Sequence, residues 1–244
     1  MRTTLKDYIE RAENTEDTEA LFRSFDQLVR HYGIDVSSYH ILAEQLRRVP
    51  IENGIIHQTF PVDWAEKYLK NRYADFDPLL NQARSEARPF HWFDVEDRMK
   101  LSKQQRAFLK ELKQVGLRDG LAIPIFGPIG TMAFFGLGSL TGPLDLEAQE
   151  IAELQLVCQY THNTFIALSA DFPMREPAQP LSPRETEILT LVAAGLSNIA
   201  IAKKLSITEN TVDTILRRAF KKLDANNRIT AVLKGIGSGL ILPD

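Results

Sequence analysis

The sequence predicts an α+β protein in which a domain of mixed helices and strands precedes a smaller domain of helices alone. Three observations support this class. Helical and strand-like patterns alternate up to residue 169, the segment 171–183 holds four prolines and no periodic apolar pattern, and every later pattern is helical. The boundaries that follow are a first domain over residues 1–170, a linker over 171–180 and a second domain over 181–244.

In the first domain, apolar residues recur at helical spacing in six segments, near residues 4–12, 17–32, 62–71, 77–87, 102–115 and 145–169. Runs rich in β-branched and aromatic residues lie between them and predict strands. These runs are SSYHILA, NGIIHQTF, FHWFDV, LAIPIF and MAFFGLGS. The patterns by themselves fit either an α/β or an α+β arrangement.

The composition is that of a folded globular protein, with 44% hydrophobic and 25% charged residues in 244. No apolar run reaches the roughly 18 residues that a membrane helix needs. The start, MRTTLKDYIERAENTEDTEALF, is acidic and periodic, unlike a secretory signal. The single cysteine, Cys158, cannot form an internal disulfide, which favours a reducing compartment and a place in the core. We therefore expect a cytoplasmic protein without a membrane-bound part.

Charge is divided unevenly between the two domains. From Leu181 onward, nine Lys and Arg residues oppose six Asp and Glu residues, a net charge of +3, whereas residues 1–180 carry −6 and the whole chain −3. An acidic body joined to a basic domain indicates that only the second domain meets a polyanion.

The second domain carries clear helix start signals. Ser182 and Glu185 form a capping box with a proline between them at the first helical position, and Gly195 ends that helix. The segment SNIAIAKKL predicts a second helix, ENTVDTILRRAFKKL predicts a third that Thr208 caps, and a last helix is expected near 226–238. Two short helices joined by a tight turn form a helix-turn-helix.

The third helix of this domain has an apolar stripe and a charged outer face. The stripe consists of Val212, Ile215, Leu216, Ala219 and Leu223. The charged residues outside it suit contact with phosphates, although a basic face on a purely structural bundle would look the same.

Specific signatures favour DNA binding. They are Leu181-Ser182-Pro183-Arg184-Glu185, Ala194-Gly195, Asn198, Ile201-Ala202, Leu205, Thr211-Val212, Lys222-Leu223, Asn227-Arg228, Ala231 and Gly239-Leu240-Ile241. Together they resemble the four-helix DNA-binding domain of LuxR-type transcription regulators. The resemblance implies that the third helix contacts DNA through Asn210, Thr211, Asp213, Thr214, Arg217, Arg218 and Lys221.

Asp213 departs from that family's pattern, which usually has Lys or Arg at this position. A carboxylate facing phosphates weakens DNA binding. Asp213 lies four residues before Arg217, so an ion pair can aim the guanidinium group. It can instead accept a hydrogen bond from the amine of cytosine, or it simply weakens the contact. The sequence leaves these three explanations open.

The first domain carries a second set of spaced residues. Trp64 and Tyr68 are one helical turn apart. Asp77 lies nine residues after Tyr68 and directly precedes a proline, and Trp92 lies fifteen residues after Asp77. Core aromatic residues with a helix-capping aspartate explain this set as well. With the following G-x3-G pair, however, the spacing resembles the acyl-homoserine lactone-binding domain of quorum-sensing LuxR-type receptors. The resemblance covers residues 5–170 and implies an α/β/α sandwich with an antiparallel sheet.

The resemblance also implies roles for these residues. Asp77 would accept the amide N–H of the lactone ligand, Trp64 would donate its indole N–H to the lactone carbonyl, and Tyr68 and Trp92 would line the pocket. A mostly apolar cavity with a few convergent polar groups suits such an amphipathic amide. Candidates for the acyl tunnel, each also explicable as ordinary core, are Leu80, Phe108, Leu112, Leu117 and Met132.

Two positions depart from the receptor pattern. Phe60 stands where many members have tyrosine, and Gly136 where many have Ser or Thr. Each change removes a hydroxyl that can bond an acyl carbonyl or a 3-oxo group, and glycine is also expected to free volume. We therefore expect tolerance for an unsubstituted and long acyl chain.

The expected function is that of a ligand-gated transcription regulator that binds a pseudo-palindromic DNA site as a dimer, because each helix-turn-helix reads one half-site. The helices near 145–169 and 226–238 are candidate dimer surfaces, and the first can equally well pack on its own sheet. The expected partners are double-stranded DNA, an acyl-homoserine lactone, a second copy of the chain and, for an activator, RNA polymerase. An alternative is a LuxR-type regulator that needs no ligand or answers to a different small molecule.

Other classes of protein fit the sequence poorly. A phosphoacceptor receiver domain would begin with a strand and an acidic pair, whereas this chain begins with helical patterns. An enzyme acting on the lactone would need catalytic groups. The chain has no nucleophile elbow, no metal-spaced pattern among its five histidines and no carboxylate pair besides Asp75 and Asp77. We expect no catalytic residue, no metal and no cofactor.

Overall fold

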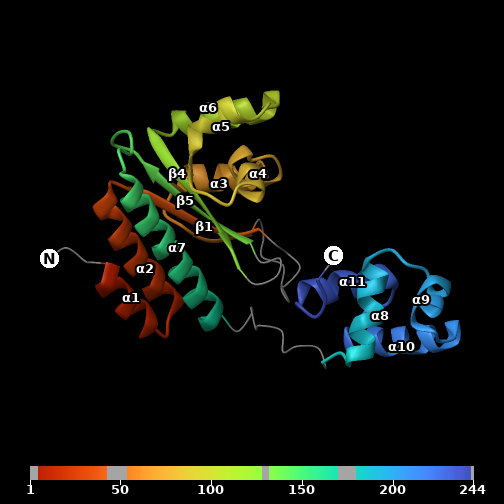
Figure 1. Cartoon of the computed structure of the whole chain (residues 1–244). Helices are drawn as coiled ribbons and strands as arrows, with labels where there is room; N and C mark the ends of the chain where they lie inside the picture. The colour runs from red at the N-terminus through yellow and green to blue at the C-terminus, as the bar shows by residue number, and fades with distance from the viewer. Residues whose placement is uncertain (1–4, 43–53, 128–131, 170–179, 243–244) are drawn as a thin grey trace. The chain divides into compact units, whose positions relative to one another are not determined.

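A computed structural model describes residues 5–42, 54–127, 132–169 and 180–242 of the chain (Figure 1). The chain divides into two compact units, Met1–Pro173 and Met174–Asp244. The expected linker, 171–180, lies outside the described residues apart from Pro180, so its extent stays a prediction.

The first unit is built around an antiparallel sheet in the order β2-β1-β5-β4-β3. The strands are β1 (Val36–Ile41), β2 (Ile55–Gln58), β3 (Phe90–His91), β4 (Asp119–Phe126) and β5 (Met132–Ser139). Every neighbouring pair runs antiparallel, and the β4–β5 hairpin pairs from Asp119↔Ser139 to Phe126↔Met132. The expected antiparallel sheet is therefore confirmed.

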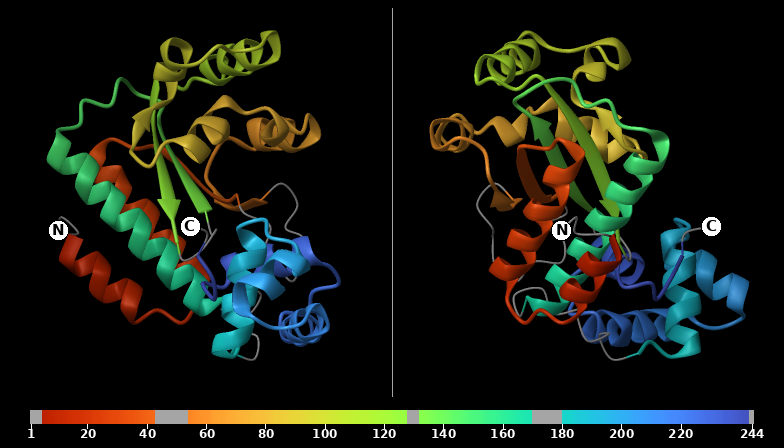
Figure 2. Two further views of the ribbon diagram at one scale, coloured as in Figure 1. Left: turned by 45° about the vertical axis from the view of Figure 1, so that its right-hand side comes forward. Right: turned by 90° about the vertical axis from the view of Figure 1, so that its left-hand side faces the viewer.

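Helices cover both faces of this sheet (Figures 1 and 2). One layer consists of α1 (Leu5–Glu13), α2 (Thr18–Val29) and α7 (Ala148–Leu168). The opposite layer consists of α3 (Val62–Lys70), α4 (Pro78–Ser85), α5 (Val95–Arg98) and α6 (Lys103–Gln114). The short 3-10 helices are η1 (Arg30–Tyr32), η4 (Tyr73–Asp75) and η5 (Trp92–Asp94). This arrangement is the expected α/β/α sandwich.

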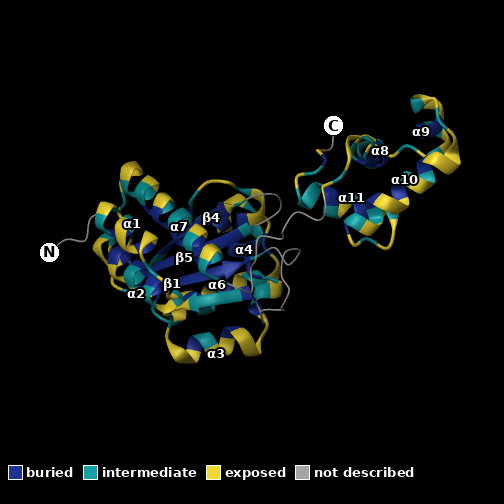
Figure 3. Ribbon diagram, turned by 90° about the horizontal axis from the view of Figure 1, so that it is seen from below, coloured by how far each residue is buried: buried dark blue, intermediate teal, exposed yellow. Residues whose placement is uncertain are grey.

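The pleat of the strands divides their side chains between two cores. On β1, Tyr39 and Ile41 pack into the core shared with α1, α2 and α7, whereas Val36 packs into the core on the opposite face. Ser38 and His40 have the same parity as Val36, so they face the layer of α3 to α6. All six residues of β1 are buried, as the dark strand in Figure 3 shows.

One predicted strand is wrong in its extent. The segment FHWFDV pairs only at Phe90↔Ala122 and His91↔Leu121, and it then turns into η5 and α5. Trp92 would next pair with Gly120, but its indole lies flat on that glycine instead: a Cβ at Gly120 would come within 2.2 Å of the ring. Aromatic content predicted a strand, and tertiary packing of one large ring ended it.

The long helix α7 packs on its own sheet. Leu154, Val157 and Phe165 are buried in the core shared with α1 and α2, and Cys158 lies fully buried among them. The expectation that Cys158 fills the core is therefore confirmed. No helix in the part of the chain that the structure describes is long and apolar enough to span a bilayer.

The second unit contains the four expected helices, α8 (Pro183–Ala193), α9 (Asn198–Leu205), α10 (Glu209–Lys222) and α11 (Arg228–Gly237). Ser182 and Glu185 form the predicted capping box, and Ser197 and Thr208 cap α9 and α10. Ser206, in the left-handed region at φ 54°, turns the chain between α9 and α10. The helix-turn-helix is therefore confirmed.

Candidate functional site

A cavity lies between the sheet and the layer formed by α3, α4 and α6. Its empty volume of about 480 Å³ includes open solvent at the mouth. The predicted residues that line it are Phe60, Trp64, Tyr68, Asp77, Trp92, Phe108 and Leu112. Most of this wall is aromatic or aliphatic, with few polar groups, as in a site for an amphipathic small molecule.

Other predicted residues do not reach the cavity wall. Leu80 and Leu117 are buried in the surrounding apolar core, and Met132 packs against the same core. Gly136 lies beneath neighbouring side chains. The two leucines and Met132 therefore pack as ordinary core residues and do not line the predicted acyl tunnel.

The cavity also contains residues that sequence reasoning missed. The main ones are Ser38, His40, Ile55, Gln58, Leu79 and Phe134. Strand periodicity puts Ser38 and His40 on one face of β1, but it cannot say which face meets a ligand. Leu79 is two residues beyond Asp77, and that short spacing was an available signal.

Asp77 both caps a helix and faces the cavity. Its Oδ1 accepts a hydrogen bond from the backbone N–H of Leu79 at 2.8 Å, which begins α4 with proline at the first position. Its Oδ2 accepts from the Tyr68 hydroxyl at 2.8 Å. The side chain is 4% exposed, and burial raises the pKa of Asp77 to about 6 although these donors act to lower it.

Neighbouring aromatic rings form much of the cavity wall. The Trp64 ring lies 6.4 Å from Tyr68 and 5.9 Å from Phe108, measured between centroids. On another side, Phe60 stacks on Trp92 with an interplanar angle of 17°. Such rings form a rigid apolar enclosure that excludes water from the buried carboxylate.

Trp92 lies flat on a patch of glycine. A Cβ at Gly120, Gly136 or Gly138 would come within 2.2, 3.3 and 3.1 Å, respectively, of the indole ring. These three glycines of β4 and β5 therefore leave room for the indole on the sheet. This close approach explains the need for glycine at Gly120, the second glycine of the predicted G-x3-G pair.

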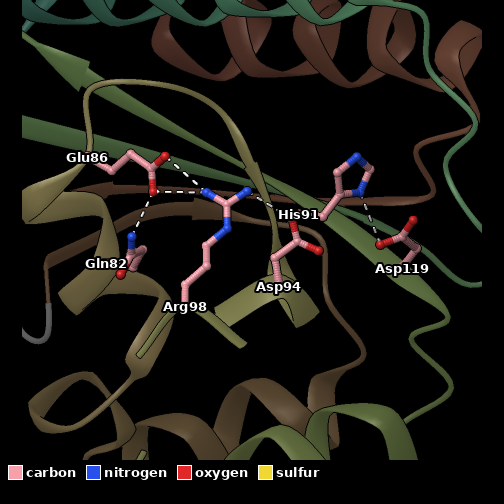
Figure 4. A network of polar contacts seen from close by, with 6 residues as sticks. All are labelled: Gln82, Glu86, His91, Asp94, Arg98 and Asp119. Carbon is pink, nitrogen blue, oxygen red and sulfur yellow. Dashed lines mark hydrogen bonds and ion pairs between the residues drawn. The ribbon is translucent and has the colours of Figure 1, made fainter. Parts of the chain in front are cut away.

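Polar contacts on both sides of η5 hold Trp92 in place (Figure 4). His91 Nδ1 lies 3.4 Å from Asp119 Oδ1 before the tryptophan. After it, Arg98 donates to Asp94 at 3.0 Å and to Glu86, at the end of α4, at 3.0 Å. The bond from Arg98 to Glu86 ties α5 to the end of α4, the helix that Asp77 caps.

The expectation that Gly136 frees volume is wrong. A Cβ at this position would lie 2.8 Å from Ser38 Oγ, 3.1 Å from the Phe134 ring and 3.3 Å from the Trp92 ring. These neighbours already occupy the space beside the glycine. The cavity therefore gains no room there.

Two residues that line the cavity, His40 and Trp92, each have a buried polar atom without a hydrogen-bond partner among the described residues, namely His40 Nδ1 and Trp92 Nε1. His40 is 5% exposed, and burial lowers the pKa of its imidazole to about 4, so the ring is neutral at pH 7. No cluster of His, Cys, Asp and Glu in the described ranges is suited to hold a metal ion.

In the second unit, α10 presents a basic surface. The predicted DNA contacts that are exposed are Asn210, Thr211, Thr214, Arg217, Arg218 and Lys221. Asp213 is partly exposed, and its Oδ2 lies 2.8 Å from Arg217 Nη2. The i,i+4 ion pair that the sequence suggested is thus formed. The predicted apolar stripe faces inward, with Val212, Leu216, Ala219 and Leu223 buried and Ile215 partly buried.

Comparisons with known proteins agree with this geometry. The autoinducer binding domain family matches residues 17–165, and the bacterial regulatory proteins of the luxR family match residues 179–234. The quorum sensing-dependent transcriptional regulator RpaR of Rhodopseudomonas palustris is 29% identical over 235 residues, 96% of this chain and 93% of RpaR. The transcriptional activator protein TraR of Agrobacterium vitis is 32% identical over 169 residues, 68% of this chain and 71% of TraR.

Among solved structures, Escherichia coli SdiA is similar with a TM-score of 0.68 at 21% identity, over 98% of both chains. SdiA in complex with octanoyl-rac-glycerol gives a TM-score of 0.68 at 19% identity, over 98% of this chain and 96% of that one. At these identities the likeness establishes the fold alone. RpaR and TraR are transcription regulators, which confirms the expectation that this chain is not an enzyme. The chain therefore belongs to the LuxR family of quorum-sensing transcription regulators, with an autoinducer-binding domain followed by a LuxR-type helix-turn-helix domain.

Proposed function

We propose that the autoinducer is an N-acyl-homoserine lactone, bound in the cavity of the first unit, and that the chain acts in the cytoplasm as a dimer on a pseudo-palindromic DNA site. The observation that carries the ligand class is Asp77. Its carboxylate is buried in an apolar cavity and accepts hydrogen bonds from the Tyr68 hydroxyl and the backbone N–H of Leu79. A carboxylate has about four lone-pair sites, so these two bonds leave room for a ligand N–H.

An amide N–H is well matched to that site. It supplies the missing donor without adding a charge, and an acyl chain on the amide would fill the aromatic cavity. Trp64, 3% exposed and on the same wall, has an indole N–H suited to a lactone carbonyl. Because ligand and folded protein stabilise each other, occupancy would raise the stability of the first unit.

The DNA contact is proposed for α10. Its exposed face carries Arg217, Arg218 and Lys221, whose phosphate contacts would release counterions and make binding salt-dependent. Asn210 and Thr214 on the same face supply polar groups for base edges. RNA polymerase would be a further partner if the regulator activates transcription.

Dimerisation is proposed through the last helix of the second unit. Ile229 and Leu233 stand one turn apart on α11 and are 71% and 54% exposed. Apolar side chains left on a surface at this spacing favour pairing with the same helix of a second copy. Two α10 helices would then read two half-sites.

The ligand is tested by thermal unfolding of the purified chain with a series of N-acyl-homoserine lactones of different lengths. At least one lactone should raise the melting temperature, with a saturable dose dependence. Binding to duplex DNA is then measured with and without that lactone, which also shows the direction of the response.

The same assay includes octanoyl-rac-glycerol, with which one SdiA structure is in complex. A glycerol ester has no amide N–H to offer Asp77. Stabilisation by this ester and by no lactone would replace the proposed ligand with the alternative, a different small molecule.

A further inference from the structure

We propose that the cavity contains a second polar subsite, formed by His40, Trp92 and Ser38, which binds an oxygen on the acyl chain and makes the receptor prefer 3-oxo or 3-hydroxy lactones to unsubstituted ones. The inference rests on the proposed lactone function and names the class of acyl chain. It reverses the sequence-based expectation of an unsubstituted chain.

The first support is His40. The imidazole lines the cavity, is 5% exposed, and its Nδ1 has no hydrogen-bond partner within the described part of the chain. A buried polar atom in a folded protein is normally bonded, because leaving it unpaired forfeits the bonds it had with water. A ligand that enters the cavity is a natural partner for this atom.

The second support is Trp92, which lines the same cavity and is 2% exposed. Its Nε1 is also buried without a partner among the residues described. An indole N–H is a donor only, so its partner must be an acceptor. Neutral His40 can donate from Nδ1 as well, and a single ligand oxygen satisfies a donor of either kind.

The third support is Ser38. It precedes His40 by two residues on β1 and pairs with Gly136 of β5. Its Oγ lies 2.8 Å from the point that a Cβ at Gly136 would occupy, and the Trp92 ring lies 3.3 Å from that same point. The hydroxyl that residue 136 lacks is therefore supplied from the neighbouring strand, beside the indole.

The position of the subsite limits which ligand oxygen it meets. The His40 ring lies 6.3 Å from the Tyr68 ring, and the Tyr68 hydroxyl binds Asp77. The Tyr68 ring thus lies between the His40 imidazole and the Asp77 carboxylate, which we propose binds the amide of the ligand. With the ligand amide at Asp77, an oxygen near the start of the acyl chain would come close to His40. An oxygen at the far end of the chain would lie beyond it.

The experiment measures the affinity of the full chain for N-octanoyl-, N-(3-oxooctanoyl)- and N-(3-hydroxyoctanoyl)-homoserine lactone by calorimetry. The wild type should bind an oxygenated ligand about tenfold more tightly than the plain one, as expected for one satisfied buried polar group. In His40→Leu this ratio should fall to about one, whatever the change in the affinity for the plain octanoyl lactone.

Phe108→Leu is the matched control, because Phe108 lines the cavity without a polar atom. It should weaken all three ligands alike and keep their ratio. The wild-type ranking needs no variant and remains decisive if His40→Leu does not fold. Equal binding of the three by the wild type, or an unchanged ratio in His40→Leu, overturns the subsite alone. If no lactone binds, the proposed ligand class is overturned and the subsite with it.

Discussion

At the scale of single residues, Asp77 combines a structural task with a binding task. Asparagine can also cap α4, so Asp77→Asn should leave the free energy of unfolding within about 1 kcal/mol of the wild type. It should weaken lactone binding about tenfold or more, because a charge-assisted hydrogen bond to the amide is lost. Asp77→Ala should lose the cap as well. Calorimetry and denaturant unfolding separate the two losses.

Asp75→Asn is the control, since Asp75 is exposed and pairs with Arg72 outside the cavity. It should leave lactone affinity unchanged. If Asp77→Asn bound the lactone as well as the wild type does, the ligand amide would have a different acceptor.

The raised pKa of Asp77, about 6 against an ordinary 3.8, makes ligand binding depend on pH. The folded chain holds this proton more tightly than the unfolded chain. The free energy of unfolding therefore decreases as pH rises from about 4 to 6, because the buried carboxyl group must then ionise. An amide N–H needs the ionised form. Lactone affinity should therefore increase as pH rises from 5 to 7, and it should vary less in Asp77→Asn. Titration calorimetry across that range provides the check.

Gly136 should not tolerate a side chain. A Cβ there would meet Ser38 Oγ at 2.8 Å, so Gly136→Ala should reduce the free energy of unfolding by about 1–3 kcal/mol. Removing the hydroxyl with Ser38→Gly should recover part of this loss in the double variant. Gly142→Ala is the control, because no atom lies within 4 Å of its Cβ position. A fully stable Gly136→Ala chain would contradict the close packing.

The polar residues of the cavity wall show which site residues can and cannot be predicted from the sequence. Trp64, Tyr68 and Asp77 were found because their spacing is distinctive. Ser38 and His40 were not found, because alternation along a strand gives two equivalent faces and only the packing of helices decides between them. The filled space beside Gly136 was equally invisible, since it depends on Ser38 of β1 and Trp92 of η5, which are far from Gly136 in the sequence.

At the scale of elements, the ion pair on α10 answers part of the question about Asp213. An exposed i,i+4 pair is worth only about 0.3–0.5 kcal/mol, so Asp213→Ala should hardly change the stability of the helix. On random-sequence duplex DNA it should strengthen binding a few-fold, because a repulsive charge is removed. Arg217→Ala should weaken binding and lower the slope of log K against log salt by about one.

Salt titrations with both variants measure these effects, and selection from a pool of duplexes reports base preference. If Asp213 reads cytosine, Asp213→Ala should relax selection at one base pair. If Asp213 aims Arg217, both variants should lose the same preference. A variant that changes neither affinity nor preference would leave Asp213 without a part in DNA contact.

Helix ends were the most predictable feature at this scale, because local chemistry sets them. The capping residues Ser182, Ser197 and Thr208 fixed the starts of α8, α9 and α10. The end of β3 was not predictable, because the indole of Trp92 packs on a glycine almost thirty residues away in the sequence.

At the scale of the whole molecule, the antiparallel pairing came from family resemblance and not from periodicity. The same strand patterns fit parallel and antiparallel sheets, since the choice depends on contacts between distant segments. The division into two units was visible from composition, because a proline-rich segment separates different patterns.

Self-association is the prediction that belongs to this scale. Ile229→Glu on α11 should weaken the dimer about tenfold or more, because a charge would be buried in the apolar contact. Sedimentation velocity measures this directly. Ile199→Glu is the control, because Ile199 is similarly exposed, at 64% against 71%, but lies on α9. If the Ile229→Glu variant remained fully dimeric, the dimer contact would not be on α11, and α7 would be the remaining candidate.

The chain contains two tryptophans, Trp64 and Trp92, and both line the cavity. Its intrinsic ultraviolet emission on excitation near 295 nm, a wavelength selective for indole, therefore originates from that one place. Any shift in emission colour or quenching on adding a small molecule would report events at the cavity wall, without a dye or label. The molecule thus carries its own optical probe for screening.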